Sequence, residues 1–227
     1  MNRDLYGLMI KYPEPGRVKT RLAKDIGNEK AAEIYRQVAE QVMKQTDPIS
    51  FSHYAIQCPP LKKGGIAESC SRDELIPGAY ERVIFYDPPE RLCDFEQWLR
   101  HEKFIPQQGN DVGERMDNAI RELLALGAGK AVITGADIPG LDSDIIARAF
   151  TELEHADIVI GPAKDGGYYL IGMKEPHAEI FQGIPWSTEK VLRHTVSLIE
   201  TLHLTVAKTP VLSDLDRIED LAGFPQW

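Results

Sequence analysis

The sequence predicts an α/β fold in which a mostly parallel sheet lies between two layers of helices. Short apolar runs of strand length recur along the 227 residues, and segments with helical spacing of apolar residues separate them. Strands that alternate with such helices form βαβ units, whose strands pair in parallel and are covered on both faces. No repeat, low-complexity tract or linker divides the chain, so we expect a single domain over residues 1–227.

The elements of the first half follow from apolar spacing. The run LYGLMI is buried-strand-like, whereas EKAAEIYRQVAEQVMKQT places its apolar side chains at helical intervals. A stretch rich in Pro, Gly and charge, residues 59–79, is expected to form a loop, with room for a short helix. In chain order we expect a strand at 5–10, a helix at 29–46, strands at 51–58 and 82–87, and a helix at 91–101.

The second half carries helix start signals as well as apolar spacing. DVGE at 111–114 is a capping-box pattern, and Asp216 with Glu219 has the same spacing, so we expect Asp216 to cap a short last helix. The expected elements are a helix from Asp111 to about Gly127, a strand at 130–137, a helix at 142–155, strands at 156–163 and 166–173, a helix at 187–202, a strand at 203–209 and a helix at 216–224.

Composition and charge exclude several classes of protein. The chain has 26 basic and 35 acidic residues, a net charge of −9, which argues against nucleic acid as the main partner. Its three cysteines contain no CxxC pair, so neither a disulfide framework nor a zinc site is indicated, and a reducing, cytoplasmic setting fits. We expect no membrane segment, since no apolar stretch approaches the roughly 20 residues that a spanning helix needs.

A local excess of positive charge follows the first expected strand. The stretch KYPEPGRVKTRLAK at 11–24 holds five basic residues and one acid. Ligands bind beyond the carboxyl ends of the strands in an open α/β sheet. A helix start attracts phosphate, and basic side chains add to that attraction. The stretch therefore indicates a site for a phosphorylated or nucleotide ligand, and the alternative is a solvated basic loop.

Carboxylates follow later strands at the same expected edge. Asp137 comes directly after a buried strand, where a lone carboxylate is typical of a Mg²⁺ ligand or of an Asx turn. Asp214 is a candidate second metal ligand. Gly166 and Gly167 open a strand without side-chain bulk, with Asp165 at their entrance. This pattern fits the close approach of a ligand or of another backbone, or a simple glycine bulge.

Two other motifs limit the chemistry. The helix cap at 111–114 explains most residues of the motif QQGNDVGERM but not Gln108. Gln108 is therefore a candidate ligand contact. No GxSxG occurs, which argues against an α/β-hydrolase, and the histidines show no metal-ligand spacing such as HExxH.

Six motifs in order give the chain a family resemblance. KYPEPGRVKTRLAKDIG, QQGNDVGERM, TGADIPGL, GPAKDGGYYLIGM, PWSTEKVLRHT and DLDRIEDL together resemble a bacterial family of glycosyltransferase-A-like proteins with the nucleotide-diphospho-sugar transferase fold. More distantly, the chain is similar to guanylyltransferases of the molybdenum-cofactor and phospholactate kinds. The resemblance implies a three-layer, Rossmann-like α/β/α fold.

The resemblance also implies roles for individual residues. The loop after the first strand would hold the nucleotide phosphates, through Pro15, Gly16, Arg17, Lys19 and Arg21. Asp137 would hold Mg²⁺ or Mn²⁺. Asp165, Gly166 and Gly167 would line the acceptor side.

The sequence departs from the resemblance at two motifs. Pro13, Pro15 and Gly16 stand where nucleotidyltransferases of this fold usually carry several glycines. Gly135 stands at the first position of the Asp-x-Asp pair that is usual in glycosyltransferases of this fold.

Three functions fit these residues. The first is nucleotidyl transfer from a nucleoside triphosphate to a small, phosphorylated acceptor, with Lys19 and Arg21 stabilising phosphoryl charge. The second is glycosyl transfer from a nucleotide sugar, with Asp165 as the base for an acceptor hydroxyl. The third is a nucleotide-binding domain without turnover. The missing Asp-x-Asp pair favours the first.

Overall fold

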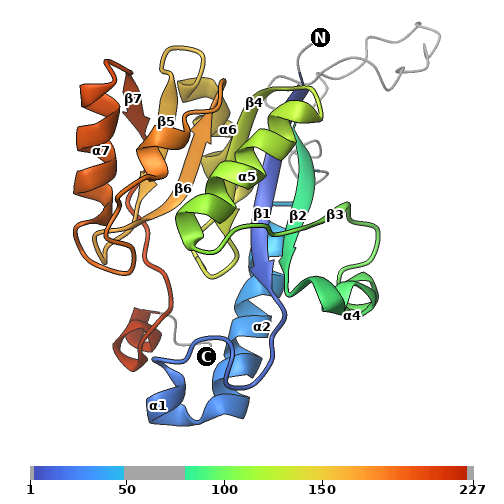
Figure 1. Cartoon of the computed structure of the whole chain (residues 1–227). Helices are drawn as coiled ribbons and strands as arrows, with labels where there is room; N and C mark the ends of the chain where they lie inside the picture. The colour runs from blue at the N-terminus through green and yellow to red at the C-terminus, as the bar shows by residue number, and fades with distance from the viewer. Residues whose placement is uncertain (1–2, 49–79, 224–227) are drawn as a thin grey trace, which may run out of the picture.

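The computed structural model describes residues 3–48 and 80–223, which form a seven-stranded sheet between helices (Figure 1). The strands are β1 (Arg3–Lys11), β2 (Glu81–Asp87), β3 (Phe104–Pro106), β4 (Ala128–Gly135), β5 (Ile158–Pro162), β6 (Tyr168–Met173) and β7 (Val206–Lys208). Their order in the sheet is β3-β2-β1-β4-β6-β5-β7. The expected strand at 51–58 lies outside the described residues, and β3 is a strand that the sequence did not predict.

One strand runs against the others. β6 pairs antiparallel with both β4 and β5, whereas every other neighbouring pair is parallel. Because β6 is reversed, its first residue lies at the edge where its neighbours end: Tyr168 pairs with Pro162. The turn at 163–167 is thereby brought to the carboxyl edge of the sheet. The prediction of a mostly parallel sheet is confirmed.

Helices cover both faces of the sheet. The helices are α1 (Ala23–Ile26), α2 (Asn28–Gln45), α4 (Leu92–Trp98), α5 (Val112–Ala125), α6 (Ser143–Glu152), α7 (Val191–Thr201) and the 3-10 helices η1 (Pro89–Arg91), η2 (Ala178–Phe181) and η3 (Ile218–Gly223). Buried side chains of α2, α4 and α6 share one core cluster with β1, β2 and β4. Those of α5, η2 and α7 share a second cluster on the opposite face. None of the described helices is long and apolar enough to cross a membrane.

The expected capping residues behave differently from one helix to the next. Asp111 accepts a hydrogen bond from the Glu114 amide at 2.8 Å, and Asp142 caps α6 in the same way through the Ile145 amide at 3.0 Å. These carboxylates satisfy amides that the helix leaves without partners. α7 begins at Val191, four residues later than expected.

The predicted capping role of Asp216 is wrong. The carboxylate that accepts the amides before η3 belongs to Asp220, which takes hydrogen bonds from the amides of Asp216 at 2.9 Å and Arg217 at 2.7 Å. The Asp216 carboxylate instead accepts from the Arg21 guanidinium at 2.8 Å. Because Asp220, in the first turn of η3, accepts these amides, the Asp216 carboxylate is available to pair with Arg21 in a distant part of the chain.

A buried hydrogen bond ties the two central strands together. The hydroxyls of Tyr6 on β1 and Thr134 on β4 lie 2.7 Å apart, and both residues are almost fully buried. Burial raises the pKa of the Tyr6 hydroxyl to about 12, so the group stays neutral. Each hydroxyl thus has a partner inside the protein, and Thr46 and Arg82 also act on the Tyr6 hydroxyl.

We expect Tyr6→Phe and Thr134→Val each to lower the free energy of unfolding by about 1–3 kcal/mol, because each leaves a buried hydroxyl without its partner. The double variant should lose less than the sum, with a coupling energy of about 1 kcal/mol. Urea unfolding of the four proteins measures this cycle. Losses that simply add would show that the two hydroxyls do not depend on each other.

Candidate functional site

The basic loop after β1 turns one lysine inward. Residues 12–22 connect β1 to α1, and the backbone enters the left-handed region at Gly16 (φ +82°) and again at Lys19 (φ +47°). A non-glycine residue in this region is strained, and such strain is concentrated at functional sites. The Lys19 side chain is only 4% exposed, and its Nζ lies 2.8 Å from Oδ2 of Asp137, just beyond the end of β4. The loop is therefore anchored to the turn after the neighbouring strand.

The ion pair between Lys19 and Asp137 sets the electrostatics of this edge. A buried ammonium needs a partner charge, because its desolvation is otherwise too costly. Burial by itself would raise the pKa of the Asp137 carboxyl, but the charge and hydrogen bond of Lys19 outweigh burial and hold that pKa below its usual range. Asp137 is thus a permanent anion, and its side chain is still 38% exposed.

Two further carboxylates stand near this pair. The Leu215 amide donates to the Asp137 carbonyl at 3.2 Å, which fixes the segment containing Asp214 beside the end of β4. Burial first, and then the negative charges of Asp165 and Asp137, raise the pKa of the Asp214 carboxyl to about 6. In the described part of the chain, no group of three or more His, Cys, Asp or Glu residues is arranged to hold a metal ion. Any metal here would therefore have at most two carboxylate ligands from the described chain.

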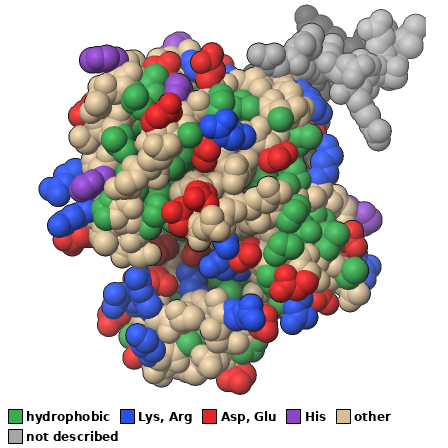
Figure 2. Space-filling view, viewed as in Figure 1, with side chains coloured by type: hydrophobic (Ala, Val, Ile, Leu, Met, Phe, Trp, Pro, Cys, Tyr) green, Lys and Arg blue, Asp and Glu red, His purple; other side chains and the backbone are tan. Residues whose placement is uncertain are grey.

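The other basic residues of the loop face outward or toward the C-terminal segment. Arg21 pairs with Asp216 at 2.8 Å, and Arg17, 67% exposed, lies 3.6 Å from Glu14. Figure 2 shows a cleft with basic side chains around it, between the body of the molecule and the part that contains α1 and η3 in Figure 1. The structure thus brings Lys19, Asp137 and Asp214 together, while Arg17 and Arg21 occupy the outer loop.

The glycines at 166–167 have a structural explanation. Gly166 has φ +90°, and a Cβ there would collide with the backbone of Glu189. The Leu192 amide donates to the Gly166 carbonyl at 3.0 Å. The Gly167 amide donates to Asp165 Oδ1 at 2.9 Å, which makes Asp165 a turn-forming residue as well. Another backbone fills the space beside Gly166, so acceptor binding at both glycines stays a prediction.

Sequence reasoning missed residues that organise this edge. The side-chain amide of Gln107 donates to the carbonyls of Phe85 at 2.8 Å and Ile10 at 3.3 Å, so it ties the ends of β2 and β1 together. The neighbouring Gln108, which the sequence suggested as a ligand contact, is exposed, and its carbonyl accepts from Asn118 at 2.9 Å. Gln107 and Gln108 have the same side chain, so the sequence shows that a glutamine is available here. It does not show which of the two faces the strand ends.

A tyrosine of α2 also reaches the site. The Tyr35 hydroxyl accepts a hydrogen bond from the Lys11 amide at 2.9 Å, at the last residue of β1. Burial raises the pKa of this hydroxyl, and the Asp137 charge adds to the shift, which places the group near that carboxylate. Because Tyr35 belongs to the apolar stripe of its helix, its contact with the end of β1 could not be predicted from the sequence.

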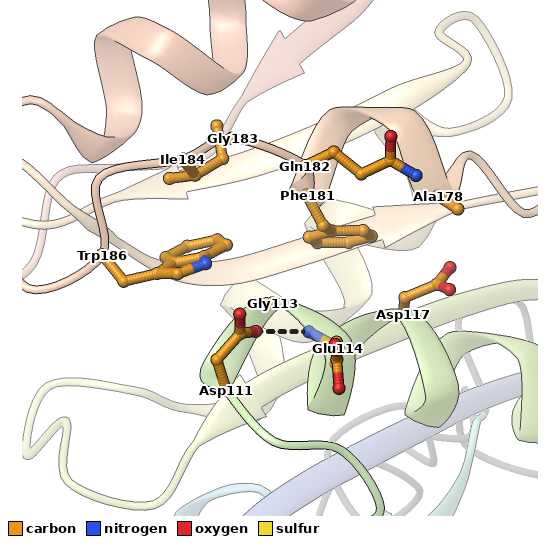
Figure 3. A pocket seen from close by; sticks show the side chains of 10 residues that line it. All are labelled: Asp111, Gly113, Glu114, Asp117, Ala178, Phe181, Gln182, Gly183, Ile184 and Trp186. Carbon is orange, nitrogen blue, oxygen red and sulfur yellow. Dashed lines mark hydrogen bonds between the residues drawn. The ribbon is translucent and has the colours of Figure 1, made fainter.

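A cavity of about 450 Å³ lies between the start of α5 and the segment 178–186 (Figure 3). The rings of Phe181 and Trp186 form one wall, and the acids of the first turns of α5 stand opposite. A Cβ at Gly113 would collide with the Trp186 indole, so this glycine allows the ring to pack on the helix. Carboxylates of the α5 side and aromatic rings of the 178–186 side thus face one another across the cavity.

We expect Asp214→Asn to stabilise the protein at pH 7. Its folded pKa of about 6 is higher than the ordinary value near 3.9, so the ionised group destabilises the fold above pH 6, and the penalty disappears as the pH falls to about 4. With a discount for partial exposure, the gain at pH 7 is on the order of 1 kcal/mol. Urea unfolding at pH 4.5 and pH 7 measures it, with Asp220→Asn as a control that removes the η3 contact. A loss of stability at pH 7 equal to that at pH 4.5 would contradict the assignment.

Comparison with known proteins assigns the fold. No curated protein matches the chain. The chain is 31% identical to a protein from Desulfovibrio desulfuricans G20 described as a "putative nucleotide-diphospho-sugar transferase", with a TM-score of 0.81 over 99% of this chain and 87% of that one. The seven-stranded α/β fold is therefore that of the nucleotide-diphospho-sugar transferases.

Two more distant structures share the fold. One is CMP:2-keto-3-deoxy-manno-octonic acid synthetase complexed with CTP, at 9% identity and a TM-score of 0.53, over 99% of this chain and 98% of that one. The other is Rv0371C from Mycobacterium tuberculosis H37Rv in complex with manganese, at 10% identity and a TM-score of 0.50, over 98% of each chain.

The family comparison agrees with the fold. Residues 76–188, which contain Asp137 and Asp165, match the family described as "Uncharacterized protein conserved in bacteria (DUF2064)". The chain belongs to this bacterial family, DUF2064, and has the nucleotide-diphospho-sugar transferase fold.

Proposed function

We propose that this protein is a metal-dependent nucleotidyltransferase that moves a nucleotidyl group from a nucleoside triphosphate to a small phosphorylated acceptor. The observation that carries the proposal is the buried Lys19 ammonium, held 2.8 Å from Asp137 beyond the ends of β1 and β4. This is the edge at which open α/β sheets bind ligands. The description of a distant structural neighbour as a complex with CTP supports a nucleotide at this edge.

The basic loop supplies the phosphate contacts in this proposal. Lys19 offers an ammonium that is already desolvated, so its attraction for phosphoryl oxygens is not weakened by bulk water. Arg17 and Arg21 form the outer wall, and the 3.6 Å pair of Arg17 with Glu14 is weak enough for a phosphate to replace it. Pro15 and Gly16 shape the backbone between them. Gln108 stays a predicted contact of the nucleotide.

The residues at the end of β4 fit a divalent cation. Asp137 bonds to Lys19 through Oδ2, its side chain is 38% exposed, and the nearby Asp214 is an anion that its surroundings destabilise. Mg²⁺ and Mn²⁺ take one or two carboxylates and fill their other positions with water and substrate phosphates. An ion held by Asp137 and Asp214 would neutralise charge on the phosphate oxygens. The manganese complex of a distant neighbour supports this choice.

The proposed reaction asks little covalent chemistry of the protein. An oxygen of the acceptor phosphate forms a bond to the α-phosphorus, and the bond from that phosphorus to the bridging oxygen breaks. The electron pair of the broken bond leaves with pyrophosphate. No proton has to be removed from an ionised phosphate nucleophile, so positioning and positive charge suffice, and Lys19 with Arg21 provides the charge.

Glycosyl transfer from a nucleotide sugar is the second candidate, favoured by the description of the Desulfovibrio desulfuricans protein. An acceptor hydroxyl then needs a base within hydrogen-bond reach. Asp165 is the candidate, because only Oδ1 accepts the Gly167 amide and the side chain is exposed. The third candidate is a nucleotide-binding domain without turnover, and the assays described next distinguish it from both enzymes.

Pyrophosphate release from each of the four nucleoside triphosphates, compared with hydrolysis of nucleotide sugars, separates the candidates. We expect pyrophosphate only with Mg²⁺ or Mn²⁺ present, and a decrease of about 10²–10³-fold in Asp137→Ala, which removes the charge beside the reacting phosphates. Asp144→Ala, an exposed carboxylate of α6, serves as the matched control. If nucleotides bind and neither reaction occurs, the protein is a nucleotide-binding domain without turnover. If no nucleotide produces a thermal shift at any metal concentration, both enzyme functions are excluded.

Lys19→Met tests the role of the ion pair without an activity assay. In the nucleotide-free protein Lys19 occupies Asp137, so its removal should raise the affinity for Mn²⁺ roughly tenfold, the effect of about 1.4 kcal/mol. The same variant should weaken binding of nucleoside triphosphates by losing a phosphate contact. Mn²⁺ titration followed by electron paramagnetic resonance measures the first effect, and Arg21→Met is the control. Unchanged Mn²⁺ affinity would show that Asp137 is not a metal ligand.

A further inference from the structure

We propose that a second pocket, lined by Lys164, Asp165, Gly166, Glu189, Lys190 and Arg193, binds the phosphate of the acceptor. The pocket has a volume of about 370 Å³ and opens to solvent where the turn before β6 meets the start of α7. The assignment of this phosphate to the acceptor rests on the proposed function. The proposal that the pocket binds a phosphate rests on the charges and geometry of the pocket.

Three cations in this pocket lack carboxylate partners. Within the described residues, the side chains of Lys164, Lys190 and Arg193 form no ion pair and no hydrogen bond, although the chain has a net charge of −9. Some basic residues elsewhere are paired, such as Arg82 with Glu102, whereas lysines such as Lys30 and Lys208 also form no ion pair among the described residues. What sets this pocket apart is that three cations gather in one lining, beside two carboxylates, Asp165 and Glu189. One oxygen of Asp165 is engaged by the Gly167 amide. The unpaired cations therefore offer charge-assisted contacts to a dianion.

The backbone holds the two sources of cations in one arrangement. The Lys164 amide donates to the Leu212 carbonyl at 3.0 Å, and the Leu192 amide donates to the Gly166 carbonyl at the same distance. Gly166 packs directly on the Glu189 backbone, where no Cβ fits. Lys164 on one segment and Lys190 with Arg193 on the other are thus presented to one pocket by a fixed junction, which reduces the cost of ordering them around a ligand.

The pocket adjoins the candidate active site. The Lys164 amide donates to the carbonyl of Leu212, and the amide of Leu215, three positions later, donates to the carbonyl of Asp137 beyond the end of β4. An extended chain of that length spans at most about 11 Å. Asp165, which lines the pocket, also influences the Asp214 carboxyl by its charge. The pocket and the end of β4 are therefore joined by one short segment, and Asp165 and Asp214 stand between them.

The position of the pocket favours an acceptor phosphate over the phosphates of the nucleotide. The loop after β1 already presents Lys19, Arg17 and Arg21 toward a nucleotide, on a different segment of the edge. The second set of cations comes from the β5–β6 turn and the start of α7, beyond Asp165. Two separate basic sets at one edge fit a reaction that joins two phosphorylated substrates.

The test uses inorganic phosphate as the probe and amide chemical shifts of the full chain as the readout. Sodium phosphate is titrated against sodium chloride at equal ionic strength. We expect phosphate-specific shifts at the amides of Gly166, Gly167 and Arg193. Combined Lys164→Gln, Lys190→Gln and Arg193→Gln should weaken this binding at least tenfold, whereas Lys30→Gln, Lys44→Gln and Lys208→Gln, which remove the same charge from exposed lysines elsewhere, should not.

A second titration in the presence of a saturating nucleoside triphosphate separates the two sources of phosphate. If the acceptor is the source, phosphate still shifts Gly166 when the nucleotide is bound. Displacement of phosphate from Gly166 by the nucleotide would assign the pocket to the nucleotide and overturn the inference, as would shifts confined to residues 16–21 or unaffected by the three substitutions. Lys19→Met should weaken nucleotide binding and leave the phosphate shifts intact. If no nucleotide binds, the proposed function fails, while the phosphate titration still decides the pocket.

Discussion

The burial of one ammonium group organises the carboxyl edge of this sheet. Lys19 lies almost wholly out of water, and a charge in that position persists only if an anion accompanies it. Asp137, just past β4, supplies this anion, and the pair holds the loop after β1 against the neighbouring strand end. The backbone at Lys19 is left-handed where its side chain turns inward. The Leu215 amide then closes over the Asp137 carbonyl and brings Asp214 to the same place. The loop, the turn and the C-terminal segment are thus joined through a single pair.

The architecture could be predicted from the sequence because it depends on local patterns. The apolar runs, the helical stripe of α2 and the caps at Asp111 and Asp142 each follow from neighbouring residues. The convergence of Lys19 and Asp137 was also within reach, since parallel strands end at one edge. The direction of β6 was not, because an apolar strand buried on both faces has the same composition whichever way it runs.

The details of the site depended on contacts between distant residues. Asp216 carries a capping pattern, yet Asp220 bonds the amides and Asp216 faces Arg21, 195 residues away. The sequence allowed either a ligand or another backbone close to Gly166, and only the course of residues 188–192 shows that a backbone packs there. Gln107 and Gln108 differ only in the direction of the side chain. Sequence spacing defines which residues are available near an edge, and tertiary packing decides which of them touch.

The short hydrogen-bonded segment at 212–215 has a consequence for how the protein is made. Lys19 is synthesised early, Asp137 after more than half of the chain, and Asp214 almost two hundred residues after Lys19. A nascent chain that contains β1, β4 and their helices still lacks the segment at 212–215, whose Leu215 amide bonds to the Asp137 carbonyl. The complete edge therefore requires residues 212–215 as well as the β1 loop and the end of β4, so a chain that stops before residue 212 lacks part of it.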